Sequence, residues 1–124
     1  MGKLIFFVDD ERSILHFMEY TFKNLADYDV MTFQSGEECV KHLEKDPSLV
    51  IIDHNMAVTQ DSMNGLDLLL KIKEYSKDIP VIVLSGTREE DIIKAYSKFG
   101  ATKFVSKDSF FVDTLKEEIL RFLS

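Results

Sequence analysis

The stretch LVIID, residues 49–53, is a run of four apolar residues that ends directly in a carboxylate. A short and continuous apolar run is typical of a parallel strand that is covered by helices on both of its faces. Four further segments are strand candidates: residues 4–8, 29–33, 80–84 and 103–105. These segments are spread over the whole chain, and together they predict a sheet of five strands.

The segments between these strands carry apolar residues at helical spacing. Ile14, Met18 and Phe22 predict a first helix over residues 13–24. Ser35 is suited to cap a second helix with an acidic first turn, which suits the positive end of a helix. The remaining helical residues are Val40 and Leu43 on the inner face of the second helix, Leu66, Leu69, Leu70 and Ile72 in a third, and residues 89–99 and 111–122 in the last two.

The alternation of strands and helices decides the fold class. A chain of 124 residues suits one domain, which we expect to cover residues 1–124. Because crossovers between parallel strands are right-handed, the helices should cover both faces of one parallel sheet. The predicted class is α/β.

Bulk composition excludes several functional classes. A net charge of −7 argues against binding to nucleic acid or to an anionic membrane surface, because such binding depends on Lys and Arg. No apolar run approaches the roughly 20 residues that a membrane span needs. Cys39 is the only cysteine, so an internal disulfide is impossible, and we expect a cytoplasmic location.

Polar residues follow most of the predicted strands. They are Asp9, Asp10 and Glu11 after the first strand, Asp53 after the third, Ser85 after the fourth and Lys107 after the fifth. Sites of open parallel sheets form beyond the carboxyl ends of the strands, so these side chains should share one edge. Neighbouring carboxylates repel each other unless a cation balances them, and oxygen ligands suit Mg²⁺. Each residue alone would be an ordinary turn or cap, but their joint placement predicts a site for Mg²⁺ and a phosphoryl group.

The same segments resemble the receiver domain of bacterial two-component response regulators. The matching pieces are FFVDDE at residues 6–11, LVIIDHNM at 49–56, NGLDLL at 64–69, IPVIVLSG at 79–86 and FVSK at 104–107. The resemblance covers nearly the whole chain. It implies a flavodoxin-like (βα)5 sandwich of three layers with strand order 2-1-3-4-5.

The resemblance also implies the roles of the metal ligands. Asp53 would be the phosphoacceptor, with Asp10 as a direct ligand of Mg²⁺ and Asp9 as a ligand acting partly through water. The backbone carbonyl of Asn55 would complete the protein ligands, and Mn²⁺ is an alternative ion.

The remaining roles concern the switch and its partners. Lys107 would pair with the acceptor and the phosphate, Ser85 would supply the switch hydroxyl, and Phe104 would be the switch aromatic. The donor would be a sensor histidine kinase or a phosphotransfer protein. The recipient would be a target protein or a fused output domain, reached through the face of the fourth helix, fifth strand and fifth helix, which could also form a dimer. The chain would be a switch that assists its own dephosphorylation, not an enzyme.

Three departures from the family pattern affect these expectations. The loop between Asp53 and Gly65 is longer than usual, and Gly86 stands where alanine is common. Asp108 follows Lys107 in place of the usual proline, before which the family's bond is cis. A cis bond costs about 2.5–4 kcal/mol before a non-proline residue, so we expect either a trans bond with a shifted loop or a cis bond.

Two other functional classes compete with the switch. A pseudo-receiver would use the same fold as a phosphorylation-independent protein-binding module. A phosphotransferase or phosphatase with an aspartate nucleophile would need a second aspartate where Asn55 stands. Most aromatic residues between Tyr96 and Phe122 should be core, and His54 could modulate access to Asp53.

Overall fold

The computed structural model describes residues 3–23, 28–54, 63–86 and 89–123. The strands are β1 (Lys3–Val8), β2 (Tyr28–Phe33), β3 (Leu49–Asp53), β4 (Val81–Ser85) and β5 (Lys103–Ser106). The α-helices are α1 (Arg12–Lys23), α2 (Gly36–Lys41), α3 (Gly65–Tyr75), α4 (Glu90–Lys98) and α5 (Phe111–Leu123). A short 3-10 helix, η1 (Leu43–Lys45), follows α2.

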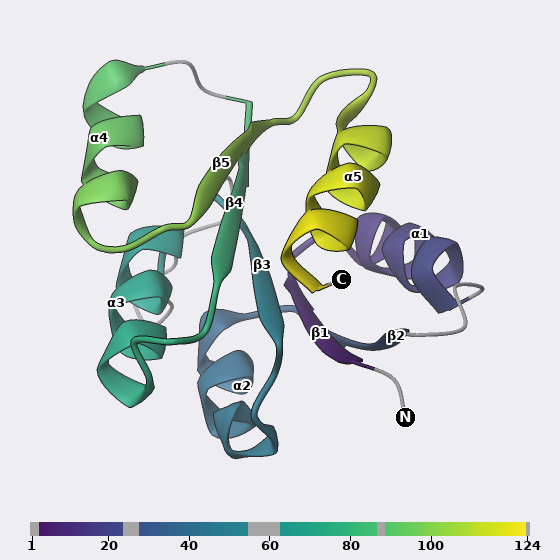
Figure 1. The fold of residues 1–124 in the computed structure, drawn as a ribbon, viewed down its shortest axis with the longest axis horizontal. Coiled ribbons are helices and arrows are strands. Elements are labelled where there is room, and N and C mark those ends of the chain that lie inside the picture. Colours follow the sequence, from purple (N-terminus) through teal and green to yellow (C-terminus); the bar gives the residue numbers. More distant parts are fainter. Residues whose placement is uncertain (1–2, 24–27, 55–62, 87–88, 124) are drawn as a thin grey trace.

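The strands form one parallel sheet in the order β2-β1-β3-β4-β5. Helices α1 and α5 cover one face, and helices α2, α3 and α4 cover the other (Figure 1). This three-layer arrangement confirms the predicted α/β class and the strand order of a flavodoxin-like fold.

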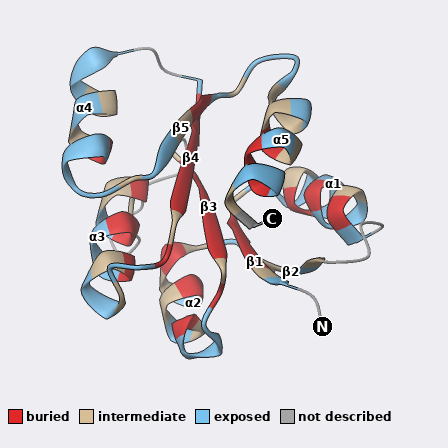
Figure 2. Ribbon diagram, viewed as in Figure 1, coloured by how far each residue is buried: buried red, intermediate tan, exposed pale blue. Residues whose placement is uncertain are grey.

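The core has two halves, one on each side of the sheet. Every residue of β3 and β4 is buried, as Figure 2 shows. Along β3 the side chains alternate: Val50 and Ile52 pack under α2, α3 and α4, whereas Leu49 and Ile51 pack under α1 and α5. A strand that is covered on both faces is a nearly continuous apolar run, as residues 49–52 are before Asp53.

The second helix is shorter than the sequence pattern predicts. Ser35 caps α2 as expected, with its hydroxyl accepting a hydrogen bond from Glu38 N at 3.3 Å. Leu43 is buried but belongs to η1, not to α2, so that prediction was wrong. The backbone turns out of η1 at Asp46, whose φ of 54° is left-handed. Burial of Leu43 does not require α-helical backbone, and this is why apolar spacing did not reveal the break.

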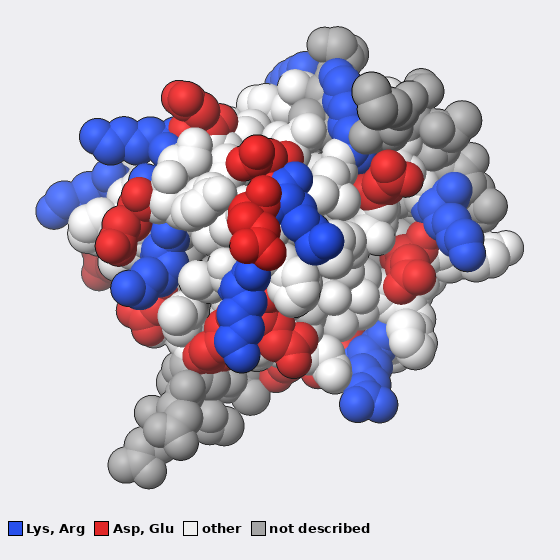
Figure 3. All heavy atoms as spheres, turned by 90° about the horizontal axis from the view of Figure 1, so that it is seen from below, with Lys and Arg blue, Asp and Glu red and all other residues white. Residues whose placement is uncertain are grey.

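The remaining surface and thiol features agree with the composition. Acidic and basic side chains are intermixed on the face seen in Figure 3. Within the described ranges, no helix has the length and apolar character that crossing a bilayer requires. Cys39 is fully buried, and burial raises the pKa of its thiol to about 12, so the reactive thiolate is absent near neutral pH.

Candidate phosphoacceptor site

The register of the sheet brings the ends of the strands together. Val8 pairs with Ile52, and Asp53 pairs with Leu84. The residue that follows β1 therefore lies beside the last residue of β3 at one edge of the sheet. This edge is where the sequence predicted the site.

Three carboxylates meet at this edge. Ligand oxygens of Asp9, Asp10 and Asp53 all lie within 4.8 Å of one another. Asp9 and Asp53 are only 4% and 3% exposed, whereas Asp10 is half-buried. These distances confirm that the three carboxylates form one cluster, as the strand pattern predicted.

Asp9 carries the feature that best fits a bound cation. Its Oδ1 accepts a hydrogen bond from Glu11 N at 2.9 Å. Its Oδ2 is buried and accepts no hydrogen bond from the part of the chain that the structure describes. A buried carboxylate oxygen of this kind, beside two further carboxylates, suits a hard divalent cation such as Mg²⁺. The predicted fourth ligand, the carbonyl of Asn55, lies outside the described residues.

Lys107 supplies the positive charge of the site. Its Nζ lies 3.2 Å from Asp53 Oδ2, to which it donates a hydrogen bond, and 3.7 Å from Asp9 Oδ2. Burial alone would lower the pKa of Lys107, but the charges of Asp53 and Asp9 outweigh burial and raise it. The lysine is therefore protonated where it contacts Asp53.

The loop after Lys107 reaches this geometry without proline. None of the described peptide bonds is cis, so the bond between Lys107 and Asp108 is trans. The backbone N–H of Lys107 donates to Ser85 O at 2.8 Å, which continues the pairing of β4 with β5. Asp108 then accepts a hydrogen bond from Phe110 N at 2.8 Å and organises the following turn. Of the two alternatives that the sequence left open, the structure has the trans bond.

The predicted switch residues lie on β4 and β5. Ser85 is fully buried and is the last residue of β4. The sequence had placed it directly after that strand. Phe104 on β5 is half-buried and packs on the side of the sheet that α4 covers. Ser85 lies on the strand next to that of Asp53, and Phe104 lies one strand further along the sheet. Their roles in a switch stay predictions.

One contact beside Asp53 was not predicted. His54 directly follows Asp53, and its Nδ1 lies 2.6 Å from the hydroxyl oxygen of Tyr96 on α4. The two residues are 42 positions apart, and neither belongs to a spacing motif. The only sequence signal was a histidine next to the acceptor, which does not indicate a partner.

The buried carboxylate of Asp9 predicts a pH dependence in metal-free protein. Burial raises its pKa from 3.8 to about 7; the Glu11 N–H opposes this shift and the Asp53 charge adds to it. Because the folded state holds the proton more tightly, the contribution of Asp9 to stability is full below about pH 4. This contribution is lost as the pH rises through about 7. In EDTA, melting temperature should therefore fall more between about pH 5 and pH 8 in wild type than in Asp9→Asn. An equal fall in both proteins would contradict the assignment.

The family model of the response regulator receiver domain matches residues 5–119. The chain belongs to this family.

Two curated relatives are longer than this chain. The alkaline phosphatase synthesis transcriptional regulatory protein PhoP of Bacillus subtilis is 29% identical over 108 residues, which are 86% of this chain and 43% of PhoP. The response regulator SaeR of Staphylococcus epidermidis is 33% identical over 101 residues, which are 81% of this chain and 42% of SaeR. The chain thus spans about two fifths of the length of these relatives.

Solved structures have the same fold. The Vibrio cholerae chemotaxis protein CheY4 gives a TM-score of 0.86 at 25% identity, with 99% of this chain and 100% of that chain covered. The phosphorylated cyanobacterial phytochrome response regulator RcpA gives a TM-score of 0.84 at 24% identity, with 100% and 96% covered. The second likeness shows the fold alone.

Proposed function

We propose that this receiver domain accepts a phosphoryl group on Asp53 in a reaction that depends on Mg²⁺. The observation that carries the proposal is the contact of 3.2 Å between Lys107 Nζ and Asp53 Oδ2, inside a cluster that also holds Asp9 and Asp10. A buried acceptor carboxylate, one cation and two further carboxylates are the parts that phosphoryl transfer needs for charge neutralisation and positioning.

The chemistry of the transfer follows from these residues. The donor is a phosphohistidine on a sensor kinase or a phosphotransfer protein. A carboxylate oxygen of Asp53 forms the new bond to phosphorus, the bond from phosphorus to the histidine nitrogen breaks, and that nitrogen keeps the electron pair. Asp9, Asp10 and Asp53 would hold Mg²⁺, which, when bound, supplies positive charge to the phosphoryl oxygens. Lys107, whose Nζ lies 3.2 Å from Asp53 Oδ2, would offset part of the remaining negative charge.

The switch would act through β4, which lies next to the strand of Asp53, and through β5, which pairs with β4. Phosphorylation turns one carboxylate charge into about −2 and adds acceptor oxygens. The hydroxyl of Ser85 then donates to a phosphoryl oxygen, and Phe104 takes the space that the hydroxyl leaves. The face of α4, β5 and α5 changes as a result. Water later hydrolyses the acyl phosphate with the help of the same site.

The partners follow from this face and from the relatives. PhoP is a transcriptional regulatory protein and is more than twice the matched length. We therefore include a fused output domain among the recipients of the signal, together with a separate target protein and a second copy of the chain. The exchange would take place in the cytoplasm.

Incubation with acetyl phosphate tests the proposal. With Mg²⁺ we expect intact mass spectrometry to show one added phosphoryl group, and with excess EDTA we expect none. Beryllium fluoride with Mg²⁺ should shift the backbone NMR signals around Asp53. A wild-type protein that gains no phosphoryl group and binds no beryllium fluoride would favour the pseudo-receiver instead.

A further inference from the structure

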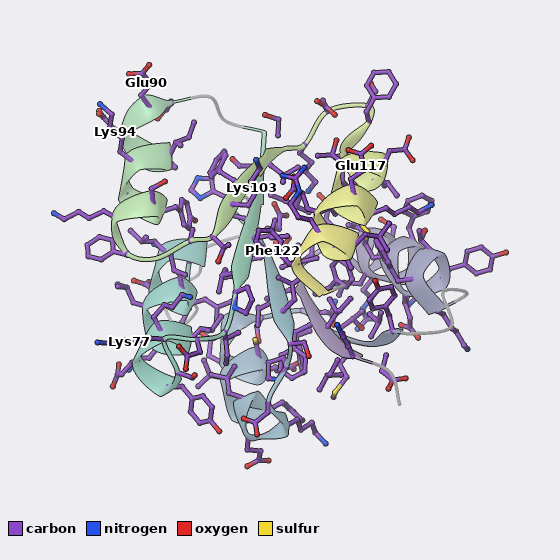
Figure 4. The ribbon with its side chains drawn as sticks, in the orientation of Figure 1. Lys77, Glu90, Lys94, Lys103, Glu117 and Phe122 are labelled. Carbon is purple, nitrogen blue, oxygen red and sulfur yellow. The ribbon has the colours of Figure 1, made fainter. Side chains whose placement is uncertain are left out.

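Tyr96 is the most buried side chain of helix α4, and Ile92 packs against the same core cluster. Tyr96 is 1% exposed and is the one fully buried residue of this helix. Glu90 and Lys94 point away from the sheet on the outer side of the same helix (Figure 4). How Tyr96 is held therefore contributes to the position of α4.

The hydroxyl of Tyr96 is held by the residue next to the acceptor. It lies 2.6 Å from His54 Nδ1, and the two rings meet edge to face with their centroids 5.3 Å apart. The backbone N–H of His54 donates to Leu84 O at 2.8 Å, so His54 itself is anchored to β4. One hydrogen bond and one peptide bond thus connect α4 to Asp53.

The slot around this hydroxyl is closed by Gly65, the first residue of α3. A Cβ placed on Gly65 would overlap the hydroxyl oxygen of Tyr96 and would lie 3.4 Å from His54 Cα. Only glycine leaves room for the phenol at this position. The tyrosine hydroxyl is therefore seated between the start of α3 and the chain that leaves β3.

The stability of the buried Tyr96 hydroxyl depends on its hydrogen bond to His54. Burial, with the charges of Asp53 and Asp67, raises the pKa of Tyr96 to about 12, so the group stays a neutral hydroxyl near neutral pH. A buried hydroxyl that loses its hydrogen bond costs free energy, because no water replaces the partner. Movement of α4 away from His54 would carry this cost.

Phe104 links the same tyrosine to the switch. Its ring centroid lies 6.0 Å from that of Tyr96. A change in the position of Phe104 would therefore alter the packing around Tyr96.

We propose that Tyr96 is a positioning residue whose hydrogen bond to His54 holds α4 in the resting arrangement and opposes the change that follows phosphorylation of Asp53. This inference rests on the proposed function. It adds a second connection between the acceptor and α4, independent of Ser85.

Tyr96→Phe tests the inference because it removes only the hydroxyl. The probe is beryllium fluoride with Mg²⁺, titrated while backbone NMR signals are recorded. We expect Tyr96→Phe to bind the probe roughly two- to tenfold more tightly, as removal of one hydrogen bond from the resting state predicts. The α4 amide signals of the unliganded variant should move toward their positions in the bound wild type.

Two further variants test the partner and the slot. His54→Leu should tighten binding in the same direction, and the double variant with Tyr96→Phe should add little, because both changes remove one bond. Gly65→Ala should displace the hydroxyl and tighten binding in the Tyr96 protein, with little further effect in Tyr96→Phe. Tyr75→Phe, an exposed tyrosine of α3, is the matched control and should bind like wild type.

The outcomes separate the inference from the proposed function. Equal or weaker binding by Tyr96→Phe, or additive effects of the Tyr96 and His54 variants, would overturn the inference while the wild type still binds the probe. A wild type that binds no probe would overturn the proposed function and the inference with it.

Discussion

Asp53→Asn is expected to take no phosphoryl group from acetyl phosphate, whatever the Mg²⁺ concentration. In the proposed reaction the carboxylate is the nucleophile, and an amide at this position is neutral and a far weaker nucleophile. The variant also removes one of three carboxylates that lie within 4.8 Å of one another, so Mg²⁺ should bind more weakly.

Intact mass spectrometry after incubation measures the effect directly. Asp29→Asn is the matched control, because Asp29 is an exposed carboxylate on β2, away from the site. It should take up the phosphoryl group as wild type does. A thermal melt establishes that Asp53→Asn is folded. Equal uptake by Asp53→Asn and wild type would show that another residue is the acceptor.

Lys107→Ala is expected to slow phosphoryl uptake by about 10²- to 10³-fold, the usual effect of removing one preorganised donor from a reacting site. The lysine Nζ lies 3.2 Å from Asp53 Oδ2 and 3.7 Å from Asp9 Oδ2, so its loss removes the positive charge next to both carboxylates. Single-turnover rates with saturating acetyl phosphate and Mg²⁺ measure this loss.

The same variant should bind Mg²⁺ more tightly. Lys107 repels a second cation in the cluster, and its removal leaves more negative charge for the metal. Slower transfer together with tighter metal binding would distinguish loss of charge at the reaction from damage to the metal site. Lys71→Ala, an exposed lysine of α3, should change neither quantity. An unchanged rate in Lys107→Ala would refute the role of the lysine.

The buried strands were predictable because burial on both faces restricts which residue types can stand at each position of the strand. β3 and β4 are covered on both faces, so every position before their polar last residues, Asp53 and Ser85, is apolar and the pattern is visible in the sequence. The order of strands then sends Asp9, Asp10 and Asp53 to one edge. The three carboxylates could therefore be assigned to one site before any distance was known.

The break between α2 and η1 was not predictable from apolar spacing. Leu43 is buried in either kind of helix, so its periodic position carries no information about the backbone hydrogen bonds. The bond after Lys107 was also open, because aspartate at position 108 permits more than one loop. In the structure, the hydrogen bond from Phe110 N to Asp108 Oδ1 stabilises the turn that follows Lys107.

By itself, the sequence determined the α/β class, the parallel strands and the acidic edge with Lys107, because each depends on residue type and short spacing. Only the tertiary structure decided that Lys107 reaches Asp53 through a trans bond and that Tyr96 meets His54 across 42 positions. Contacts of the second kind depend on how α4 packs against the sheet and on the absence of a side chain at Gly65. The strand pattern thus predicts that carboxylates lie beside Asp53. The hydrogen bond by which His54 connects Asp53 to α4 can be found only in the folded chain.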